Sequence, residues 1–254
     1  SLRTVVISGH DTIAGYSFFG CANIESITVL NRDALIGFGA FRGCSALVSL
    51  TIPFNEFPDA DPEKSAAYLG CVFGADSGFY NSDYVPKSLR TVVITQGNLG
   101  YAAFFQCENL TSITLPEGIK SIGHYAFSGC TGLTSIRIPE GVTDIGADVF
   151  KNSGIYNNAD NWEDGVLYIG TYLFRANSEI SGAYTIKKGT KCIAASAFSD
   201  CASLSSVTIP EGISKISANA FDGCSGLISV TFSDDILEIG ARAFSECSGL
   251  ISVN

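Results

Sequence analysis

The chain has 254 residues, of which 46% are hydrophobic and 16% are charged, and its formal net charge is −10. This acidic balance argues against a nucleic acid partner, because binding to phosphates needs clustered lysine and arginine side chains. It also disfavours binding to anionic membranes. No apolar run approaches the roughly 18 residues that a membrane span needs, so the hydrophobic side chains are spread over many short segments.

The chain repeats itself with a step of 23 residues, which separates Cys107 from Cys130, for example. In each repeat a phenylalanine stands three residues before a cysteine. The pairs are Phe18/Cys21, Phe41/Cys44, Phe104/Cys107, Phe127/Cys130, Phe198/Cys201, Phe221/Cys224 and Phe244/Cys247, with Phe150/Ser153 as a variant. A fixed step of this size is typical of a solenoid, in which one turn of chain cannot bury its apolar side alone.

Within a repeat, the residues after the cysteine predict a strand. After Cys107, aliphatic residues stand at Leu110, Ile113 and Leu115, and their alternation with polar residues is typical of a strand with one buried face. A proline such as Pro116 often follows and ends the strand, because proline lacks a backbone donor. Further on, an aliphatic residue precedes an Ala-Phe pair that suits a short helical turn. Each coil is therefore predicted as strand, turn, short extended stretch and one helical turn, with Phe, Cys and the aliphatic residues stacked in internal ladders.

These residues resemble the repeat of the BspA-like family of leucine-rich repeat proteins, Leu-x-x-Ile-x-Ile-Pro-x-x-Val-x-x-Ile-Gly-x-x-Ala-Phe-x-x-Cys. The coil 110–132 carries this pattern nearly whole, in Leu110, Ile113, Leu115, Pro116, Ile119, Ile122, Gly123, Ala126, Phe127 and Cys130. The resemblance covers nearly the whole chain. It implies a leucine-rich repeat solenoid, a strand-rich α/β right-handed superhelix of about ten coils with short helical turns. It also implies a mostly bacterial, secreted or surface-attached protein associated with adhesion, and it carries over no catalytic residues.

Two irregular segments, near 54–88 and 157–188, interrupt the period. In the second, Asp164-Gly165 precedes an apolar run and has the chemistry of a hairpin turn. Neither segment is long enough to form a separate domain. We therefore expect residues 1–254 to form a single solenoid that carries both segments.

The two ends of the chain resemble its interior. The heptad Ser1–Ile7 recurs letter for letter as Ser88–Ile94, and the chain stops at Asn254, inside what would be the next strand. The chain also has no methionine, so it cannot begin at its own start codon. We therefore expect the array to be truncated at both ends.

The cysteines that recur in the repeat are predicted to be buried thiols. Stacking in register makes their side chains parallel neighbours rather than partners aimed at each other, so disulfides between them are not expected. Cys71 and Cys192 lie outside the repeat position, and a bond between them stays possible. The cysteine spacing does not match a zinc site.

The sequence predicts neither an enzyme nor a cofactor. The histidines, His10 and His124, stand in turn regions and in no catalytic motif, so we expect them to be solvated. A periodic serine series reads as a packing or hydrogen-bonding position, because an active site needs one serine in a distinct environment. The series is Ser26, Ser49, Ser112, Ser135, Ser206, Ser229 and Ser252.

Two acidic groups could supply oxygen ligands to calcium. They are Asp59/Asp61/Glu63 and Asp160/Glu163/Asp164. Both lack the alternating spacing and the glycine of an EF-hand loop, so solvated loop carboxylates are the preferred interpretation and no metal site is predicted.

The outward strand positions are the first candidate contact surface. One site of the repeat is occupied by Thr28, Thr51, Thr114, Arg137, Thr208 and Thr231, which are expected to form a row across the sheet. Threonine also suits any exposed strand. The alternative is a flat, hydroxyl-rich recognition face with Arg137 as its one charge, which is the kind of surface that solenoids offer to protein partners.

The irregular segments supply aromatic residues as further candidates. They include Phe57, Phe79, Tyr80, Tyr84, Trp162, Tyr168 and Tyr172. Some of these must cover the core, and any that are exposed would suit contacts with protein or sugar. We select Tyr80, Tyr84 and Trp162 as candidate partner contacts.

The preferred functional hypothesis is a non-enzymatic protein-interaction module of a secreted or cell-surface bacterial protein, active in adhesion or in binding host or neighbouring-cell proteins. One alternative is a glycan-binding module that uses exposed aromatics of the irregular segments. Another is a passive surface spacer. An enzyme would require a polar cleft with perturbed carboxylates beside an irregular segment.

Overall fold

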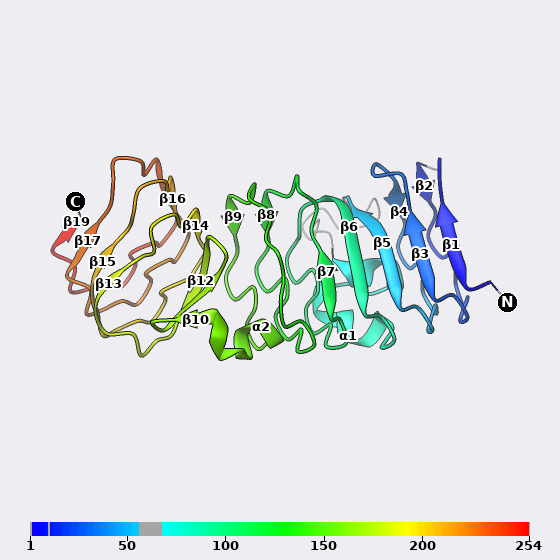
Figure 1. Ribbon diagram of the computed structural model, residues 1–254, viewed down its shortest axis with the longest axis horizontal. Helices are drawn as coiled ribbons and strands as arrows, with labels where there is room; N and C mark the ends of the chain where they lie inside the picture. The colour runs from blue at the N-terminus through cyan, green and yellow to red at the C-terminus, as the bar shows by residue number, and fades with distance from the viewer. Residues whose placement is uncertain (1, 10, 56–67, 254) are drawn as a thin grey trace. The chain divides into compact units, whose positions relative to one another are not determined.

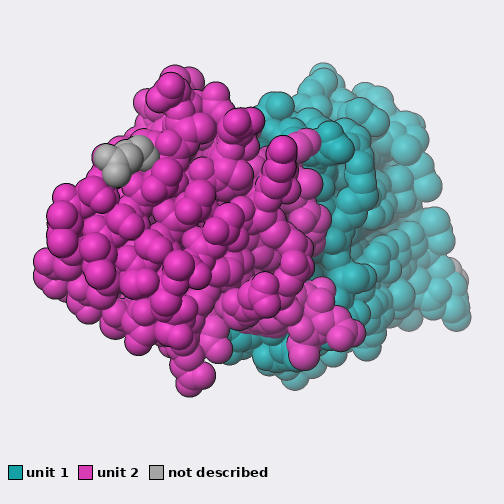
Figure 2. Space-filling model, turned by 60° about the vertical axis from the view of Figure 1, so that its left-hand side comes forward, with its two compact units in different colours: residues 1–142, 149–158 teal, residues 143–148, 159–254 magenta. Residues whose placement is uncertain are grey.

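The computed structural model describes residues 2–9, 11–55 and 68–253. Over these residues the chain forms a β-solenoid of about ten turns with little helix, which confirms the predicted fold class. Two compact units can be distinguished (Figure 2). Unit 1 comprises Ser1–Val142 and Val149–Asn158, and unit 2 comprises Thr143–Asp148 and Ala159–Asn254.

Short strands dominate unit 1. They are β1 (Thr4–Ile7), β2 (Thr12–Ile13), β3 (Ser26–Val29), β4 (Leu35–Ile36), β5 (Ser49–Phe54), β6 (Thr91–Gly97), β7 (Ser112–Thr114) and β8 (Ser121–Ile122). The helical pieces of this unit are η2 (Leu69–Phe73), η3 (Gly78–Tyr80), α1 (Asn81–Tyr84) and α2 (Gly154–Asn157).

Unit 2 is built in the same manner. Its strands are β9 (Asp144–Ile145), β10 (Trp162–Glu163), β11 (Val166–Ile169), β12 (Tyr172–Ala176), β13 (Gly182–Thr185), β14 (Cys192–Ile193), β15 (Leu204–Thr208), β16 (Lys215–Ile216), β17 (Ser229–Thr231), β18 (Glu238–Ile239) and β19 (Ser252–Val253). The short η4 (Ala159–Asn161) precedes β10.

Successive coils stack in register. In unit 1 the parallel strands follow the order β1-β3-β5-β6-β7, side by side in Figure 1. One row across this sheet consists of inward-facing aliphatic residues, namely Val5, Ile27, Leu50, Val92 and Ile113. In unit 2, β13-β15-β17-β19 form the corresponding parallel sheet. Residues at the same position of successive repeats therefore lie next to one another in the stack, as the 23-residue step predicts.

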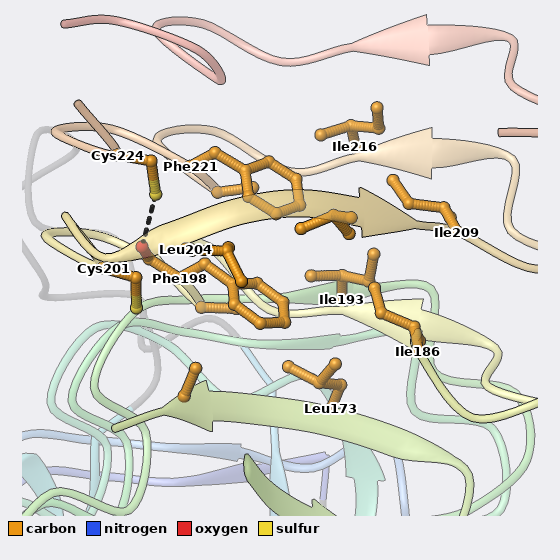
Figure 3. Close-up of a cluster of buried hydrophobic side chains, with 14 of the residues drawn as sticks. Leu173, Ile186, Ile193, Phe198, Cys201, Leu204, Ile209, Ile216, Phe221 and Cys224 are labelled. Carbon is orange, nitrogen blue, oxygen red and sulfur yellow. Dashed lines mark hydrogen bonds between the residues drawn. The ribbon is translucent and has the colours of Figure 1, made fainter. Parts of the chain in front are cut away.

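The recurring phenylalanines form internal stacks, which confirms the predicted ladder. Phe104, Phe127 and Phe150 stack with ring centroids 5.4 and 5.3 Å apart. In unit 2, Phe198 and Phe221 stack at 5.1 Å (Figure 3). All five side chains are fully buried, so the core of each unit contains a stack of aromatic rings among its aliphatic side chains.

The Ala-Phe segments are turns rather than the short helical turns that the sequence suggests. In each regular repeat, two residues of this segment have positive φ. The first stands five residues before the cysteine position, and the second stands directly before it. The first set is Tyr16, Gly39, Ala102, Tyr125, Asp148, Ser196, Asn219 and Arg242, and the second is Gly20, Gly43, Gln106, Gly129, Asn152, Asp200, Gly223 and Glu246. A left-handed residue cannot continue an α-helix, so the chain turns twice around each phenylalanine.

The first irregular segment leaves the sheet intact. Although residues 55–90 separate them, β5 and β6 pair in parallel, with Leu50 opposite Val92 and Ile52 opposite Ile94. Within the described part of the segment, η2 stacks on the preceding coil, since the Phe41 N–H donates to the Val72 carbonyl at 2.8 Å. The segment thus supplies its own turn at the position where a regular coil would have one.

Buried Asn81 fixes the described part of this segment to the solenoid. Its Oδ1 accepts a hydrogen bond from the Gly70 N–H at 2.7 Å, and its Nδ2 donates to the Ala102 carbonyl at 2.9 Å. Because these bonds satisfy both ends of a fully buried amide, they hold η2 and α1 against the coil that contains Ala102.

The second irregular segment contains the predicted hairpin. β10 and β11 pair antiparallel across Asp164 and Gly165, which both have positive φ, at 49° and 78°. Such a pair of residues defines a type I′ turn, the form that matches the twist of a two-residue hairpin. β12 then pairs antiparallel with β11 and parallel with β14, so the hairpin joins the solenoid through β12.

The recurring cysteines are thiols in the structure. Cys224 donates its S–H to the Phe198 carbonyl of the preceding coil at 3.0 Å (Figure 3), and Cys130 makes the same contact with Phe104 at 3.0 Å. Cys21 is the exposed member of the series. The cysteine position is therefore a hydrogen-bonding link between coils. Of the two cysteines outside the series, Cys71 lies buried in unit 1 and Cys192 lies buried in unit 2.

Candidate interaction surface

The outward face of the sheet β1-β3-β5-β6-β7 carries a row of threonine and valine side chains. Thr28 lies opposite Thr51, as predicted, and the row continues through β6 to Thr114. Its members in strand order are Val6, Thr28, Thr51, Val93 and Thr114. All are exposed or half-buried, so their side chains are accessible.

A second row of hydroxyl groups runs beside the first. Its members in strand order are Thr4, Ser26, Ser49, Thr91 and Ser112. Each stands two residues before its counterpart in the first row, so both rows face the same side of the sheet. The periodic serines Ser26, Ser49 and Ser112 are thus part of the accessible face. We call the two rows together the hydroxyl face.

Unit 2 has a threonine row of its own. Thr185 lies opposite Thr208, and Thr208 lies opposite Thr231. All three are exposed. The sequence predicts one row across one sheet, whereas the structure distributes these residues over two separate sheets. Thr185 was missed because the irregular segment before it hides the repeat register.

Arg137 lies beyond the last strand of the sheet in unit 1, in a stretch outside the described strands. Its guanidinium pairs with the carboxylate of Glu117, one coil earlier, through Nη1 to Oε1 and through Nη2 to Oε2 at 3.4 Å. The hydrogen bond from Arg137 lowers the pKa of Glu117. Both side chains are exposed, so the pair marks the edge of the hydroxyl face with opposite and balanced charges.

The candidate aromatic residues occupy different environments. Tyr80 is 54% exposed, and Tyr84 is partly exposed with its ring 5.9 Å from the guanidinium carbon of Arg42. Trp162 lies in β10 of unit 2 and is half-buried. The structure therefore brings Tyr80 and Tyr84 together in the first irregular segment, and places Trp162 in the other unit.

Other aromatic residues of the second irregular segment belong to the core. Tyr172 is 2% exposed and Tyr168 is 7% exposed. The hydroxyl groups of Tyr168 and Tyr184 lie 3.2 Å apart, and burial raises the pKa of Tyr184. The ring of Tyr184 also continues the aromatic stack to Phe198 at 5.8 Å.

An aromatic cluster in unit 1 was missed by the sequence analysis. Phe79 of η3 contacts Tyr101, Phe105 and Tyr125, which come from two regular coils. Of these residues, only Phe79 was named as a candidate. The other three are scattered over different repeat positions, so a periodic pattern does not reveal them.

The groups considered for chemistry do not converge on a reactive site among the described residues. Glu163 forms an ion pair with Lys187, and the described residues contain no cluster of ligands suited to a metal ion. His10, Phe57 and the acidic group Asp59/Asp61/Glu63 lie outside the described residues.

Two of the buried thiols, Cys130 and Cys224, are also poorly suited to nucleophilic chemistry. Burial raises the pKa of Cys130 and of Cys224 from 9.0 to about 12. A thiol must ionise to attack, so these groups are inert at neutral pH.

The stacked coils define the chain as a repeat protein of the leucine-rich type, a class whose members are typically interaction modules rather than enzymes. The family profile described as BspA type leucine-rich repeat region matches six copies, over residues 1–58, 97–184 and 169–254. The chain belongs to the BspA-type leucine-rich repeat family. No curated protein matches it.

Several solved structures are similar to this chain. A leucine-rich repeat protein from Bacteroides ovatus is 21% identical, over 98% of this chain and 74% of that one, with a TM-score of 0.36. A leucine rich cell surface protein from Faecalibacterium prausnitzii is 23% identical, over 99% and 81%, with a TM-score of 0.38. The pneumococcal vaccine antigen PcpA is 17% identical, over 99% and 71%, with a TM-score of 0.41.

Among the residues that the structure describes, none of the helices has the length and apolar character to cross a membrane.

Proposed function

We propose that this chain is a non-enzymatic protein-interaction module of a secreted or cell-surface bacterial leucine-rich repeat protein, and that it binds a partner through the hydroxyl face. The observation that carries this proposal is the register of the sheet in unit 1, which aligns two rows of small outward side chains. Membership of the BspA-type family supports it, because that resemblance implies surface-attached proteins that take part in adhesion.

The hydroxyl face is flat and can make both polar and apolar contacts. Neighbouring strands lie about 4.8 Å apart, so a row over the strands from β1 to β7 spans about 19 Å. The side chains in both rows are short, which leaves the surface flat and reduces the entropy lost when a partner covers it. Hydroxyl groups both donate and accept hydrogen bonds, while Val6 and Val93 add apolar contact.

Ion pairs flank this face at two points. Arg3 pairs with Glu25 beside β3, and Arg137 pairs with Glu117 beyond β7. Exposed ion pairs add little to stability. At the rim of an interface they favour partners with a complementary charge pattern and so contribute to specificity.

The proposal is tested by placing a charge in the middle of the hydroxyl face. Thr51 lies in the central strand of the sheet, and Thr51→Lys would force a partner to bury an unpaired ammonium group. Thr134→Lys is the matched control, because Thr134 is an exposed threonine outside the strands. Both variants should keep the melting temperature of the parent protein.

Binding would be measured by biolayer interferometry against purified extracellular matrix proteins and epithelial surface proteins. We expect at least one specific partner, an affinity loss of about tenfold or more for Thr51→Lys, and parent-like affinity for Thr134→Lys. A panel without binding above background would contradict the proposal. Equal binding by both variants would contradict the assignment to the hydroxyl face.

A further inference from the structure

Unit 1 contains an open hollow of about 550 Å³ beside the first irregular segment. Phe79 of η3 forms one aromatic wall together with Tyr101, Phe105 and Tyr125 of two regular coils. The hollow therefore exists because the irregular segment packs next to the turns of these coils. Its volume falls in the range of sites for small ligands.

The aromatic rings in this hollow are arranged edge to face. The ring centroid of Phe79 lies 4.9 Å from that of Phe105 and 5.3 Å from that of Tyr101, with interplanar angles of 87° and 83°. Tyr125 lies 5.7 Å from Tyr101 at 79°. Perpendicular rings fix one another, so the cluster is a preformed surface.

These rings are accessible, unlike those of the core. Phe79 is 41% exposed and Tyr101 is 46% exposed, whereas the stacked phenylalanines are fully buried. Since Phe79 and Tyr101 lie at the surface, a ligand can reach their rings.

The remaining lining of the hollow is polar and carries both signs of charge. Gln106, Glu108, Lys151 and Asn152 contribute amide, carboxylate and ammonium groups. Gln106 and Glu108 also line a smaller adjoining hollow of about 240 Å³, where the irregular segment contributes Ser82 and Asp83. Hydrogen-bonding groups thus continue from the aromatic wall into a second subsite.

We propose that this hollow binds an uncharged pyranose sugar of a glycan, with the aromatic wall as the stacking platform. A pyranose ring has one face of C–H groups, which packs on an aromatic ring, and an edge of hydroxyl groups. Those hydroxyls match the amide and carboxylate groups of Gln106, Glu108 and Asn152. The adjoining hollow would take the next sugar residue.

The balance of charges favours this occupant over others. A cationic ligand would meet the ammonium group of Lys151, and an anionic ligand would meet the carboxylate of Glu108. A proline-rich peptide needs mainly aromatic walls, whereas about half of this lining is amide, hydroxyl or charged. An uncharged polyhydroxy ring uses both parts of the lining.

The proposal is tested by saturation-transfer NMR on the intact chain. The probes are methyl glucopyranoside, galactopyranoside, mannopyranoside and N-acetylglucosaminide, each at about 10 mM, a concentration that saturates a site with a dissociation constant of about 1 mM. We expect transfer to the ring C–H protons of at least one probe. Tyr125→Ala should weaken its binding by about tenfold, and Glu108→Gln should weaken it as well.

Tyr16→Ala is the matched control. Tyr16 occupies the same position of the repeat as Tyr125 and has φ of 60°, and its ring makes edge-to-face contacts with Phe19 and Phe38 away from the hollow. The Tyr16→Ala variant should bind the probe with a dissociation constant within about twofold of that of the parent protein. A melting curve for each variant separates loss of binding from loss of folding.

The proposal would be overturned if none of the four probes bound. It would also be overturned if binding survived in both Tyr125→Ala and Glu108→Gln, or if a proline-rich peptide or a sialylated sugar bound in the hollow while the four probes did not. The inference goes beyond the protein-binding role of the hydroxyl face and does not rest on it. Thr51→Lys should leave sugar binding unchanged.

Discussion

At the scale of single residues, the phenylalanine ladder was predictable because its members recur at a fixed distance from a cysteine. The phenylalanines that join the ladder outside the 23-residue period were not predictable. Phe54 stacks on Phe104 at 5.5 Å, and Phe73 continues the series from Phe41 at 6.5 Å. Both lie in or beside the first irregular segment, where residue spacing carries no information about the coil.

Truncating a ladder residue should destabilise the protein strongly. Phe127 is fully buried between Phe104 and Phe150, so Phe127→Ala removes two ring contacts and leaves a cavity. We expect a loss of about 3–5 kcal/mol in the free energy of unfolding. Denaturant titration followed by circular dichroism measures it.

Phe19→Ala provides the control for this substitution, because Phe19 is 62% exposed. Its effect should stay below about 1 kcal/mol. Similar losses for the two variants would show that the ring column does not carry the stability of the coils.

At the scale of elements, the strands and the hairpin at Asp164-Gly165 were predictable, and the local turns were not. The Ala-Phe pairs suggest a short helical turn, yet the chain adopts left-handed φ at residues as different as Tyr125, Asp148 and Arg242. The conformation at these positions follows from stacking on the next coil, as the bond from the Phe127 N–H to the Val149 carbonyl shows. A contact between coils overrides the local preference of each residue.

The close approach of neighbouring coils gives an element-scale prediction. A Cβ atom added at Gly123 would lie 2.4 Å from the carbonyl oxygen of Gly100, one coil earlier. Gly123→Ala should therefore force the two coils apart and destabilise the protein by about 1–3 kcal/mol. The midpoint of thermal or urea unfolding reports the change.

Gly118→Ala is the matched substitution in the same coil, because an added Cβ there meets nothing within 4 Å. It should be neutral or stabilising by up to about 1 kcal/mol, since alanine restricts the unfolded chain. If Gly123→Ala behaved in the same way, the spacing of the coils could not be as close as the structure has it.

At the scale of the whole molecule, the repeat step predicted the solenoid and the number of coils. It did not predict how the outward residues are grouped. The threonine position forms one row in unit 1 and another in unit 2, and Arg137, which occupies this position between them in the sequence, lies outside the described strands. The aromatic hollow could not be predicted from the sequence either. It depends on how η3 packs beside two regular coils, and the repeat pattern gives no information about that packing.

The buried thiols should make the whole molecule less stable at alkaline pH. Burial raises the pKa of Cys130, Cys192 and Cys224 from 9.0 to about 12. Below pH 9 both folded and unfolded chains keep these protons, so the thiols add no pH dependence. Between pH 9 and about 12 the unfolded chain loses protons that the folded chain retains, and unfolding becomes more favourable.

The melting temperature should therefore fall steadily above pH 9, and the fall should be smaller in Cys224→Ala, which removes one of the titrating groups. Thermal unfolding across the range, in the presence of a reducing agent, measures both curves. A parent protein with a flat profile up to pH 11 would contradict the burial of these thiols.

The pairing of β5 with β6 across residues 55–90 has a consequence for how such a chain can change. Hydrogen bonds between the two strands hold their register, so the length of the connection does not set it, and the entropic cost of a longer connection grows only with the logarithm of its length. New sequence can enter at this point while the coils on either side keep their contacts. The position is thus a natural entry for novel segments, in evolution and in the grafting of foreign peptides for display.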